Sequence, residues 1–192
     1  QFFSDMTTQS LGSIVGRGDL IRKIRIPRWI IVFSSSLLAL INLILNLIVI
    51  SIFMIFADIE LTAAVWAFPF ILLEIYLFAL GVSLFLAAAF VKFRDINYIW
   101  EVIMQAAFYL TPILYPLSLI TSETFRKLIL MNPMAQAIQD ARYSLVTQET
   151  LTIQSIFDGG WYMLIPFAIV AVSLVGGVLY FKKESKYFAE NI

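Results

Sequence analysis

The sequence predicts an all-α membrane protein on two observations. Four apolar stretches are each long enough to cross a bilayer as a helix, namely Ile30 to Phe56, Leu61 to Val91, Tyr98 to Leu117 and Trp161 to Phe181. A spanning helix needs roughly 20 mostly apolar residues, and it satisfies its own backbone hydrogen bonds inside lipid. In addition, 61% of the 192 residues are hydrophobic, only 14% are charged, and the mean hydropathy is +0.90. These values lie outside the range of soluble globular domains.

Several kinds of chemistry are excluded by residues that the sequence lacks. It has no Cys and no His, which removes disulfides, thiol redox chemistry, most zinc sites and any histidine general base. No GxxxxGK[ST] motif is present, so this chain does not hydrolyse ATP through a P-loop. No acidic cluster typical of a metal-dependent transferase is present either. Energy for any transport must therefore come from elsewhere.

The distribution of basic residues predicts the orientation of the spans. Most of the 13 Lys and Arg residues lie in three clusters beside span ends, at Arg17 to Arg28, Lys92 and Arg94, and Lys182 to Lys186. The positive-inside rule assigns all three clusters to the cytoplasm. The short link Ala57 to Glu60 and the long stretch Ser118 to Gly160 then lie outside, in a single domain covering residues 1–192.

The first residues do not begin like a complete membrane protein. Gln1 to Val15 contains no charged segment followed by an apolar core, so it does not read as a signal peptide. We interpret it as the tail of a preceding span that enters a cytoplasmic loop, with N-terminal sequence missing.

The long outer stretch predicts two short helices that dip into the outer leaflet. Apolar residues recur at helical spacing opposite a polar set, the apolar ones being Met134, Ile138, Ala141 and Leu145 and the polar ones Gln136, Gln139, Asp140 and Tyr143. An apolar run, Phe125 to Met131, precedes this helix and ends at the turn signal Asn132-Pro133.

The segment Gly16 to Trp29 predicts a short amphipathic helix at the cytoplasmic surface. Asp19 is placed to cap it, and Pro27 ends it just before the first span. Two interpretations stay open for this segment. It is either an interfacial helix held by anionic lipid head groups or a docking helix for a cytoplasmic partner.

Glu74 lies near the middle of the second apolar stretch. A charged side chain there costs on the order of 3 kcal/mol on insertion scales, so Glu74 should face protein or water rather than lipid. A proton-coupled carrier uses such carboxylates, but usually several of them, and Glu74 has no basic partner within the predicted spans. A structural or groove-lining role is the simpler interpretation.

Polar and small residues form stripes that we expect to face other helices. One stripe on the first span contains Ser35, Ala39, Asn42 and Asn46, and another on the third contains Glu101, Gln105 and Tyr109. In the last span, Ser173 and Gly177 form a small-xxx-small pair suited to close packing. Phe108, Tyr109 and Tyr115 lie deep or beside Pro112 and Pro116, where flat aromatic rings are able to stack on sugar faces.

The run FVKFRDINYIWEVIMQAAFYLTPILYP, Phe90 to Pro116, resembles the signature region of the polysaccharide and polyol-phosphate export permeases of ATP-binding-cassette transporters. It joins Arg94-Asp95 to a span that ends in a Thr-Pro-x-x-Tyr-Pro kink. LIRKIRIPR at Leu20 to Arg28 resembles the family's entry to the third span, and NPMAQAIQDARYSLV at Asn132 to Val146 resembles its outer helices. The basic C-terminal tail also agrees, so the resemblance covers nearly the whole chain.

The resemblance implies that the four spans are the last four of six, and it assigns roles to particular residues. The residues implied in coupling to the ATPase are Leu20, Arg22, Lys23, Arg25, Pro27, Arg28, Arg94 and Asp95. Those implied in a substrate conduit are Glu74, Gln105, Phe108, Tyr109 and Tyr115, and those in an outer gate are Asn132, Pro133, Asp140 and Arg142. Glu74 departs from the family pattern, in which Gln or an apolar residue is expected.

The resemblance also implies partners and a location. The expected partners are a second permease copy, a cytoplasmic P-loop ATPase that holds ATP and Mg, membrane lipids and a lipid-linked glycan such as O-antigen, capsule or teichoic acid. No cofactor, metal or nucleic acid is expected in this chain, and the location is the bacterial inner membrane. The alternatives are an exporter of the same architecture for a drug or lipid, and an ion-coupled carrier or membrane-embedded lipid-modifying enzyme.

Overall fold

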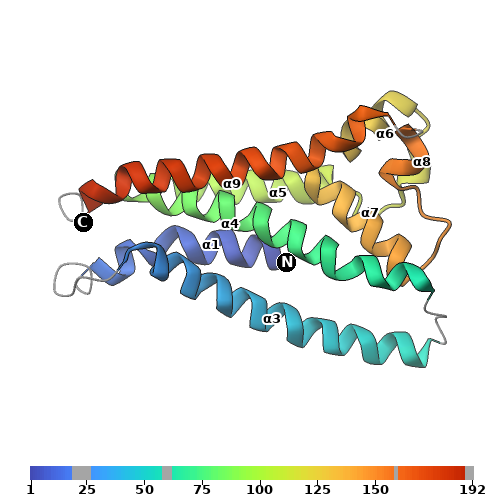
Figure 1. Cartoon of the computed structure of the whole chain (residues 1–192), viewed down its shortest axis with the longest axis horizontal. Helices are drawn as coiled ribbons and strands as arrows, with labels where there is room; N and C mark the ends of the chain where they lie inside the picture. The colour runs from blue at the N-terminus through green and yellow to red at the C-terminus, as the bar shows by residue number, and fades with distance from the viewer. Residues whose placement is uncertain (19–26, 58–61, 158–159, 189–192) are drawn as a thin grey trace.

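The computed structural model is a bundle of long helices with several short helices gathered at one end (Figure 1). It describes residues 1–18, 27–57, 62–157 and 160–188, and these residues form helices and no strand. The α-helices are α1 Phe2–Ser13, α3 Trp29–Phe56, α4 Phe68–Lys92, α5 Ile96–Leu110, α6 Glu123–Leu130, α7 Pro133–Leu145, α8 Ile153–Phe157 and α9 Ile165–Glu184. The 3-10 helices are η1 Val15–Arg17, η2 Ala63–Ala67, η3 Leu117–Leu119, η4 Trp161–Leu164 and η5 Ser185–Tyr187. The predicted all-α class is confirmed.

Three helical segments in the described ranges are long and apolar enough to cross a membrane. They are Trp29–Phe56, Ala63–Lys92 and Trp161–Tyr187, and they coincide with three of the four predicted spans. The second and third begin as the 3-10 helices η2 and η4, and Pro69 and Pro166 then stand in the first turns of α4 and α9. Proline is tolerated there because the first N–H groups of a helix have no intrahelical acceptor.

The remaining predicted span, Tyr98 to Leu117, was wrong at its end, because α5 stops at Leu110. Thr111 adopts an extended backbone, since the residue before a proline is disfavoured in the helical region and Pro112 follows it. The Thr111 hydroxyl donates to the carbonyl of Ala107 at 2.7 Å. A helix of 15 residues is about 22 Å long, which is shorter than the roughly 30 Å of hydrocarbon in a bilayer.

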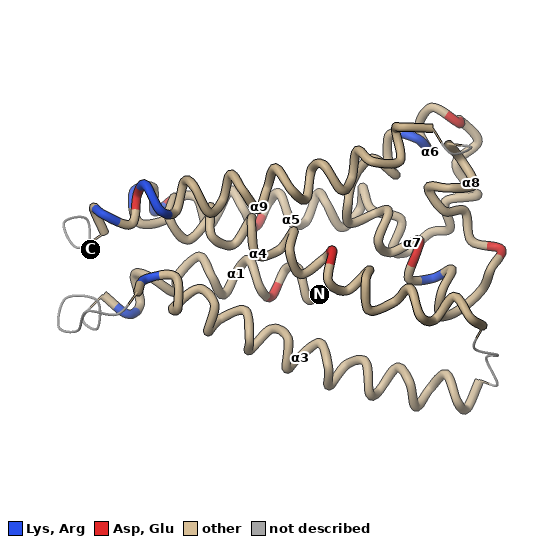
Figure 2. The backbone as a smooth tube through the Cα atoms, in the orientation of Figure 1, with Lys and Arg blue, Asp and Glu red and all other residues tan. Residues whose placement is uncertain are grey.

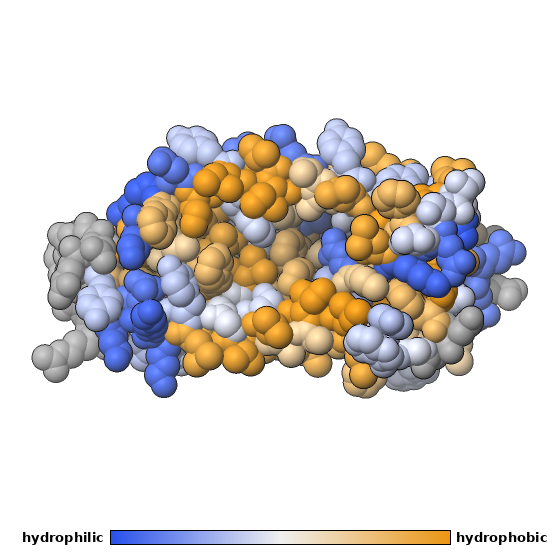
Figure 3. Space-filling view, turned by 90° about the horizontal axis from the view of Figure 1, so that it is seen from above, coloured by the Kyte–Doolittle hydropathy of each residue, from blue (hydrophilic) through white to orange (hydrophobic). Residues whose placement is uncertain are grey.

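The two ends of the bundle differ in charge (Figure 2). One end, called here the basic end, carries seven of the ten described basic residues, namely Arg17, Arg28, Lys92, Arg94, Lys182, Lys183 and Lys186. The other, the distal end, carries α6, α7 and α8. Hydrophobic residues gather between two hydrophilic ends on the face seen in Figure 3. This arrangement agrees with the predicted clustering of the basic segments on one side of a membrane.

Helix α4 occupies the centre of the bundle and packs against α1, α7 and α9. At the basic end, its Leu84, Ala87 and Ala88 form a core with Ile31 of α3 and Phe181 of α9. A second core forms around Ala79, where Phe3 of α1 stacks on Phe78 with ring centroids 5.2 Å apart. Small residues on α4 therefore let three neighbouring helices approach it closely.

The N-terminal helix α1 is built into this bundle rather than lying on its surface. Ser83 donates to the carbonyl of Met6 at 3.3 Å, and Trp100 Nε1 donates to Thr7 Oγ1 at 3.1 Å. These bonds connect α1 to α4 and to α5. The predicted tail of a preceding span is thus a helix whose Thr7 and Ser10 are fully buried.

A very close approach between two helices lies where α4 crosses α9. A Cβ atom added to Gly177 would stand 2.1 Å from the carbonyl oxygen of Gly81, and one added to Gly81 would stand 2.6 Å from the backbone nitrogen of Leu174. Both obstacles are main-chain atoms, so no side chain is able to move aside. The predicted small-xxx-small packing at Ser173 and Gly177 is confirmed, with Gly81 as its partner on α4.

The polar stripe predicted on α3 is buried only in its first half. Ser35 and Ala39 are buried, and Ser36 lies 3.2 Å from the hydroxyl of Tyr76 on α4. Asn42 and Asn46 are exposed, and the side-chain amide of Asn46 donates to the carbonyl of Asn42 at 2.8 Å. The outer half of α3 diverges from α4 in Figure 1.

Candidate functional site

The aromatic residues predicted to line a conduit gather at the end of α5. The rings of Phe108 and Tyr109 meet edge to face, with centroids 5.5 Å apart. Beyond the break at Thr111, the Tyr115 hydroxyl donates to the carbonyls of Tyr109 and Leu110 at 3.4 and 3.5 Å. These carbonyls belong to the last turn of α5, where no intrahelical donor follows. The break thus turns the chain back and brings Tyr115 beside Tyr109.

The polar stripe of α5 faces away from the rest of the chain. All of α5 is described, and none of its residues is buried; Glu101 and Gln105 are exposed, and Tyr109 is 72% exposed. Within one chain, the prediction that this stripe faces other helices is wrong. An exposed carboxylate and amide on an apolar helix are costly against lipid. We therefore expect another protein surface to cover this face of α5.

The residues predicted to form an outer gate belong to α7 and its cap. Asn132 caps the helix, since its Oδ1 accepts from the backbone nitrogen of Met134 at 3.0 Å, and Pro133 follows in the first turn. At the other end, Arg142 Nη2 donates to the carbonyl of Ile113 at 2.6 Å, and Nη1 donates to Gln139 Oε1 at 3.3 Å. Arg142 therefore attaches α7 to the segment that follows the break in α5.

The pattern predicted on α7 separates two faces, and part of its polar face points into the bundle. Gln136 and Gln139, assigned to the polar face, are each 1% exposed, whereas Met134, Ile138, Ala141 and Leu145 are only half-buried. The polar side packs toward the bundle because α4 offers Glu74 there. On the apolar side, Met134 packs against the core around Ala79, so both sides of α7 contribute to the bundle. The two predicted outer helices are present as α6 and α7, and α8 is additional.

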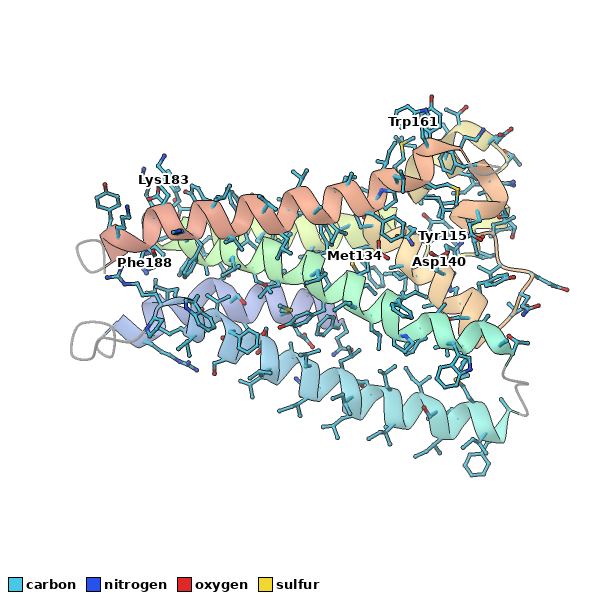
Figure 4. All side chains as sticks on the ribbon, viewed as in Figure 1. Tyr115, Met134, Asp140, Trp161, Lys183 and Phe188 are labelled. Atoms are coloured by element: carbon cyan, nitrogen blue, oxygen red, sulfur yellow. The ribbon has the colours of Figure 1, made fainter. Side chains whose placement is uncertain are left out.

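A polar cluster joins α4 to α7. The Glu74 side chain faces Gln136 and Asp140, and Gln136 Nε2 donates to Asp140 Oδ2 at 2.5 Å. Glu74 Oε1 and Gln136 Oε1 are buried and have no hydrogen-bond partner among the described residues. Burial raises the pKa of the Asp140 carboxyl above its ordinary value, although the bond from Gln136 opposes this rise. Asp140 of this cluster and Tyr115 are labelled at the distal end in Figure 4.

Glu74 is therefore brought together with Asp140 of the predicted gate. Among the described residues, no hydrogen bond joins Glu74 to the other predicted conduit residues, which are Gln105, Phe108, Tyr109 and Tyr115. Sequence reasoning missed Gln136 as the link. Its position i−4 from Asp140 was visible as a helical pair, but only the packing of α4 against α7 identifies Glu74 as the third member.

Four of the predicted coupling residues lie outside the described residues, namely Leu20, Arg22, Lys23 and Arg25. Pro27 and Arg28 precede α3 at the basic end, and the Arg28 guanidinium lies 6.0 Å from the ring centroid of Phe188. Arg94 and Asp95 are exposed in the turn between α4 and α5 at the same end. The Arg94 guanidinium lies 5.5 Å from the ring centroid of Phe90, and the Asp95 carbonyl accepts from Tyr98.

The described residues contain no group of three or more His, Cys, Asp or Glu side chains placed to hold a metal ion. The described polar side chains instead connect helices or face outward from the bundle. Spanning helices, a basic end and a distal end built from short helices define a helical integral membrane protein.

Comparison with known proteins identifies the family. The model of the ABC-2 type transporter matches residues 1–146, and the chain belongs to this family. The chain is 28% identical over 191 residues to an O-antigen export system permease protein RfbA from Klebsiella pneumoniae, covering 99% of this chain and 70% of that protein. It is 34% identical over 134 residues to the protein of the same name from Myxococcus xanthus, covering 69% and 52%. The resemblance to export permeases of ATP-binding-cassette transporters is confirmed.

Proposed function

We propose that this chain is the membrane-spanning subunit of an ATP-driven exporter that moves a lipid-linked polysaccharide or teichoic acid across the bacterial inner membrane. The observation that carries the proposal is the similarity to an O-antigen export permease over 99% of the chain. The exposed aromatic and polar face of α5 supports it, because such a face suits a glycan more than an acyl chain. The chain itself makes and breaks no bond in this scheme.

A second copy of the chain is the proposed cover for the exposed face of α5. Glu101, Gln105 and Tyr109 would then line the boundary between two copies instead of facing lipid. A path formed between copies would be bordered at its distal end by α7, which Arg142 holds to the segment after α5. In this scheme, Asn132, Pro133, Asp140 and Arg142 shape the outer exit.

The energy source is proposed to be a separate cytoplasmic ATPase docked at the basic end. The sequence has no P-loop, so ATP and Mg would bind in that partner. The segment Leu20 to Arg28 would dock the partner, together with the exposed turn at Arg94 and Asp95. With this docking, the basic end faces the cytoplasm, as the positive-inside rule requires.

Reversing charge at Arg22 and Arg25 tests the docking proposal. We expect Arg22→Glu with Arg25→Glu to reduce co-purification of the ATPase by about tenfold, a loss of about 1.4 kcal/mol, because two favourable charge contacts become repulsive. Membrane insertion should be unchanged. The matched control is Lys183→Glu with Lys186→Glu, which changes the charge of the same end equally and should keep the ATPase. Docking by this segment is wrong if the ATPase still binds, and loss of insertion would instead indicate a lipid-anchoring helix.

Glu74 separates an ATP-driven exporter from an ion-coupled carrier. We expect Glu74→Gln to lower export by less than about threefold, or under ~0.7 kcal/mol, because the amide keeps the shape and offers a donor to the unpartnered Gln136 oxygen. Export measured in vesicles should survive collapse of the proton gradient. Glu74→Leu, which offers no hydrogen bond, should instead lower the unfolding temperature. A Gln variant that is folded but inactive, with gradient-dependent native export, would favour the carrier.

A further inference from the structure

A cavity of about 620 Å³ lies at the basic end, between the start of α3, the middle of α4 and the end of α9. Its volume is in the range of pockets that hold small molecules, roughly 300–1,000 Å³. The cavity is separate from the conduit and gate residues, which lie along α5, at Glu74 of α4 and at the distal end. None of the residues on its wall belongs to the polar cluster of Glu74, Gln136 and Asp140.

The floor of the cavity is apolar, and its side opens toward the lipid-facing surface. Leu84 of α4 and Phe181 of α9 are buried at its base. Trp29 and Phe33 form the α3 wall and are 54% and 40% exposed. Because Trp29 begins the span, its ring is placed at the depth where aromatic residues meet the head groups of a bilayer. The cavity is therefore reached from the membrane as well as from the basic end.

Two cationic side chains from different helices stand on the wall of the cavity. Arg28 precedes α3 and Lys182 lies in the last turn of α9. In the part of the chain that the structure describes, neither makes an ion pair. Ser185, which donates to the carbonyl of Lys182 at 3.0 Å, adds a hydroxyl to the same wall. The polar part of the cavity thus matches an anion, and the apolar part matches a hydrocarbon chain.

We propose that this cavity binds an anionic phospholipid of the leaflet at the basic end. The phosphate lies between Arg28 and Lys182, and part of one acyl chain lies over Leu84 and Phe181. An arginine offers a planar fork of donors that pairs well with phosphate, and lysine adds a second charge. The bound lipid adds a further contact between the start of α3 and the end of α9, which already share the core at the basic end. The proposal does not depend on what the protein exports.

The test measures lipid retention by native mass spectrometry on the purified protein, titrated with phosphatidylglycerol or phosphatidylcholine. We expect phosphatidylglycerol to bind the native protein at least about tenfold more tightly, equivalent to about 1.4 kcal/mol. Arg28→Gln with Lys182→Gln should remove most of this preference. The matched control is Lys183→Gln with Lys186→Gln, which removes the same charge from the same end at two residues outside the cavity wall and should keep the preference. Figure 4 labels Lys183 beside this region.

Three results would overturn the proposal. Equal loss of the preference in the control pair would mean that the general charge of the basic end attracts the lipid. Equal binding of the two phospholipids would mean that the cations do not select a charged head group. Displacement of phosphatidylglycerol by an equimolar long-chain prenyl phosphate would assign the cavity to a lipid carrier of the glycan instead.

Discussion

Replacing Gly177 with alanine is expected to prevent α9 from packing on α4 and to leave little folded protein. The added methyl carbon would stand 2.1 Å from the Gly81 carbonyl oxygen, so the two backbones must separate. Overpacking that side chains absorb typically costs about 1–3 kcal/mol, and here the obstacle is main chain, so the cost should lie at or above the top of that range. The measurement is the fraction of detergent-extracted protein that elutes as a single species, together with its unfolding temperature.

The control for this prediction is the adjacent residue. An added methyl group at Gly176 meets no described atom within 4 Å, and alanine is favoured over glycine in a helix by about 1 kcal/mol. Gly176→Ala should therefore be neutral or stabilising, and the two neighbouring substitutions should have opposite effects. Gly81→Ala should resemble Gly177→Ala, because its methyl group would meet the backbone of Ser173 and Leu174. Equal unfolding temperatures for the Gly176 and Gly177 variants would contradict the close crossing.

Replacing Tyr109 and Tyr115 together with alanine is expected to lower glycolipid export by about tenfold, or about 1.4 kcal/mol, while assembly and ATPase association persist. If sugars pass along aromatic faces between two copies, removing both rings removes the stacking surface. Phenylalanine at both positions should be much milder, because the ring faces remain and the Tyr115 hydroxyl makes only long hydrogen bonds of 3.4 and 3.5 Å.

Tyr98 supplies the matched control for the aromatic pair. It is also an exposed tyrosine of α5, but it lies at the basic end, where an interfacial belt explains it. Tyr98→Ala should leave export nearly unchanged in the same assay. Normal export by the double alanine variant would remove the sugar-stacking hypothesis and leave Tyr109 and Tyr115 as packing aromatics.

The long spans and their close packing were predictable from the sequence because they depend on local properties. Hydropathy located α3, α4 and α9, and the spacing of Ser173 and Gly177 identified the face of α9 that packs tightly on α4. The sequence also grouped the basic clusters that flank the spans at one end, since the positive-inside rule needs only the order of spans and charges.

The end of α5 and the orientation of α7 were harder to predict because they depend on competing or distant contacts. Hydropathy continues through Ile113 and Leu114, so the apolar signal concealed the helix stop that Thr111 and Pro112 impose. For α7, periodicity separates two faces but does not say which one points inward; that choice follows from Glu74, sixty-two residues before Gln136. The coupling, conduit and gate roles of individual residues stay predictions.

The bond from Arg142 to Ile113 has a consequence for how freely this region varies. The Arg142 guanidinium donates its hydrogen bond to a main-chain oxygen, so this contact does not depend on which side chain occupies position 113. The residue at position 142 is restricted, because Arg142 uses two nitrogens, Nη1 on Gln139 and Nη2 on Ile113. A lysine has a single side-chain nitrogen and is less suited to make both hydrogen bonds. Engineered hybrids that exchange the segment after α5 between relatives should therefore keep the hydrogen bond from position 142 to the carbonyl of position 113. The condition is that the backbone path of that segment and the arginine are both preserved.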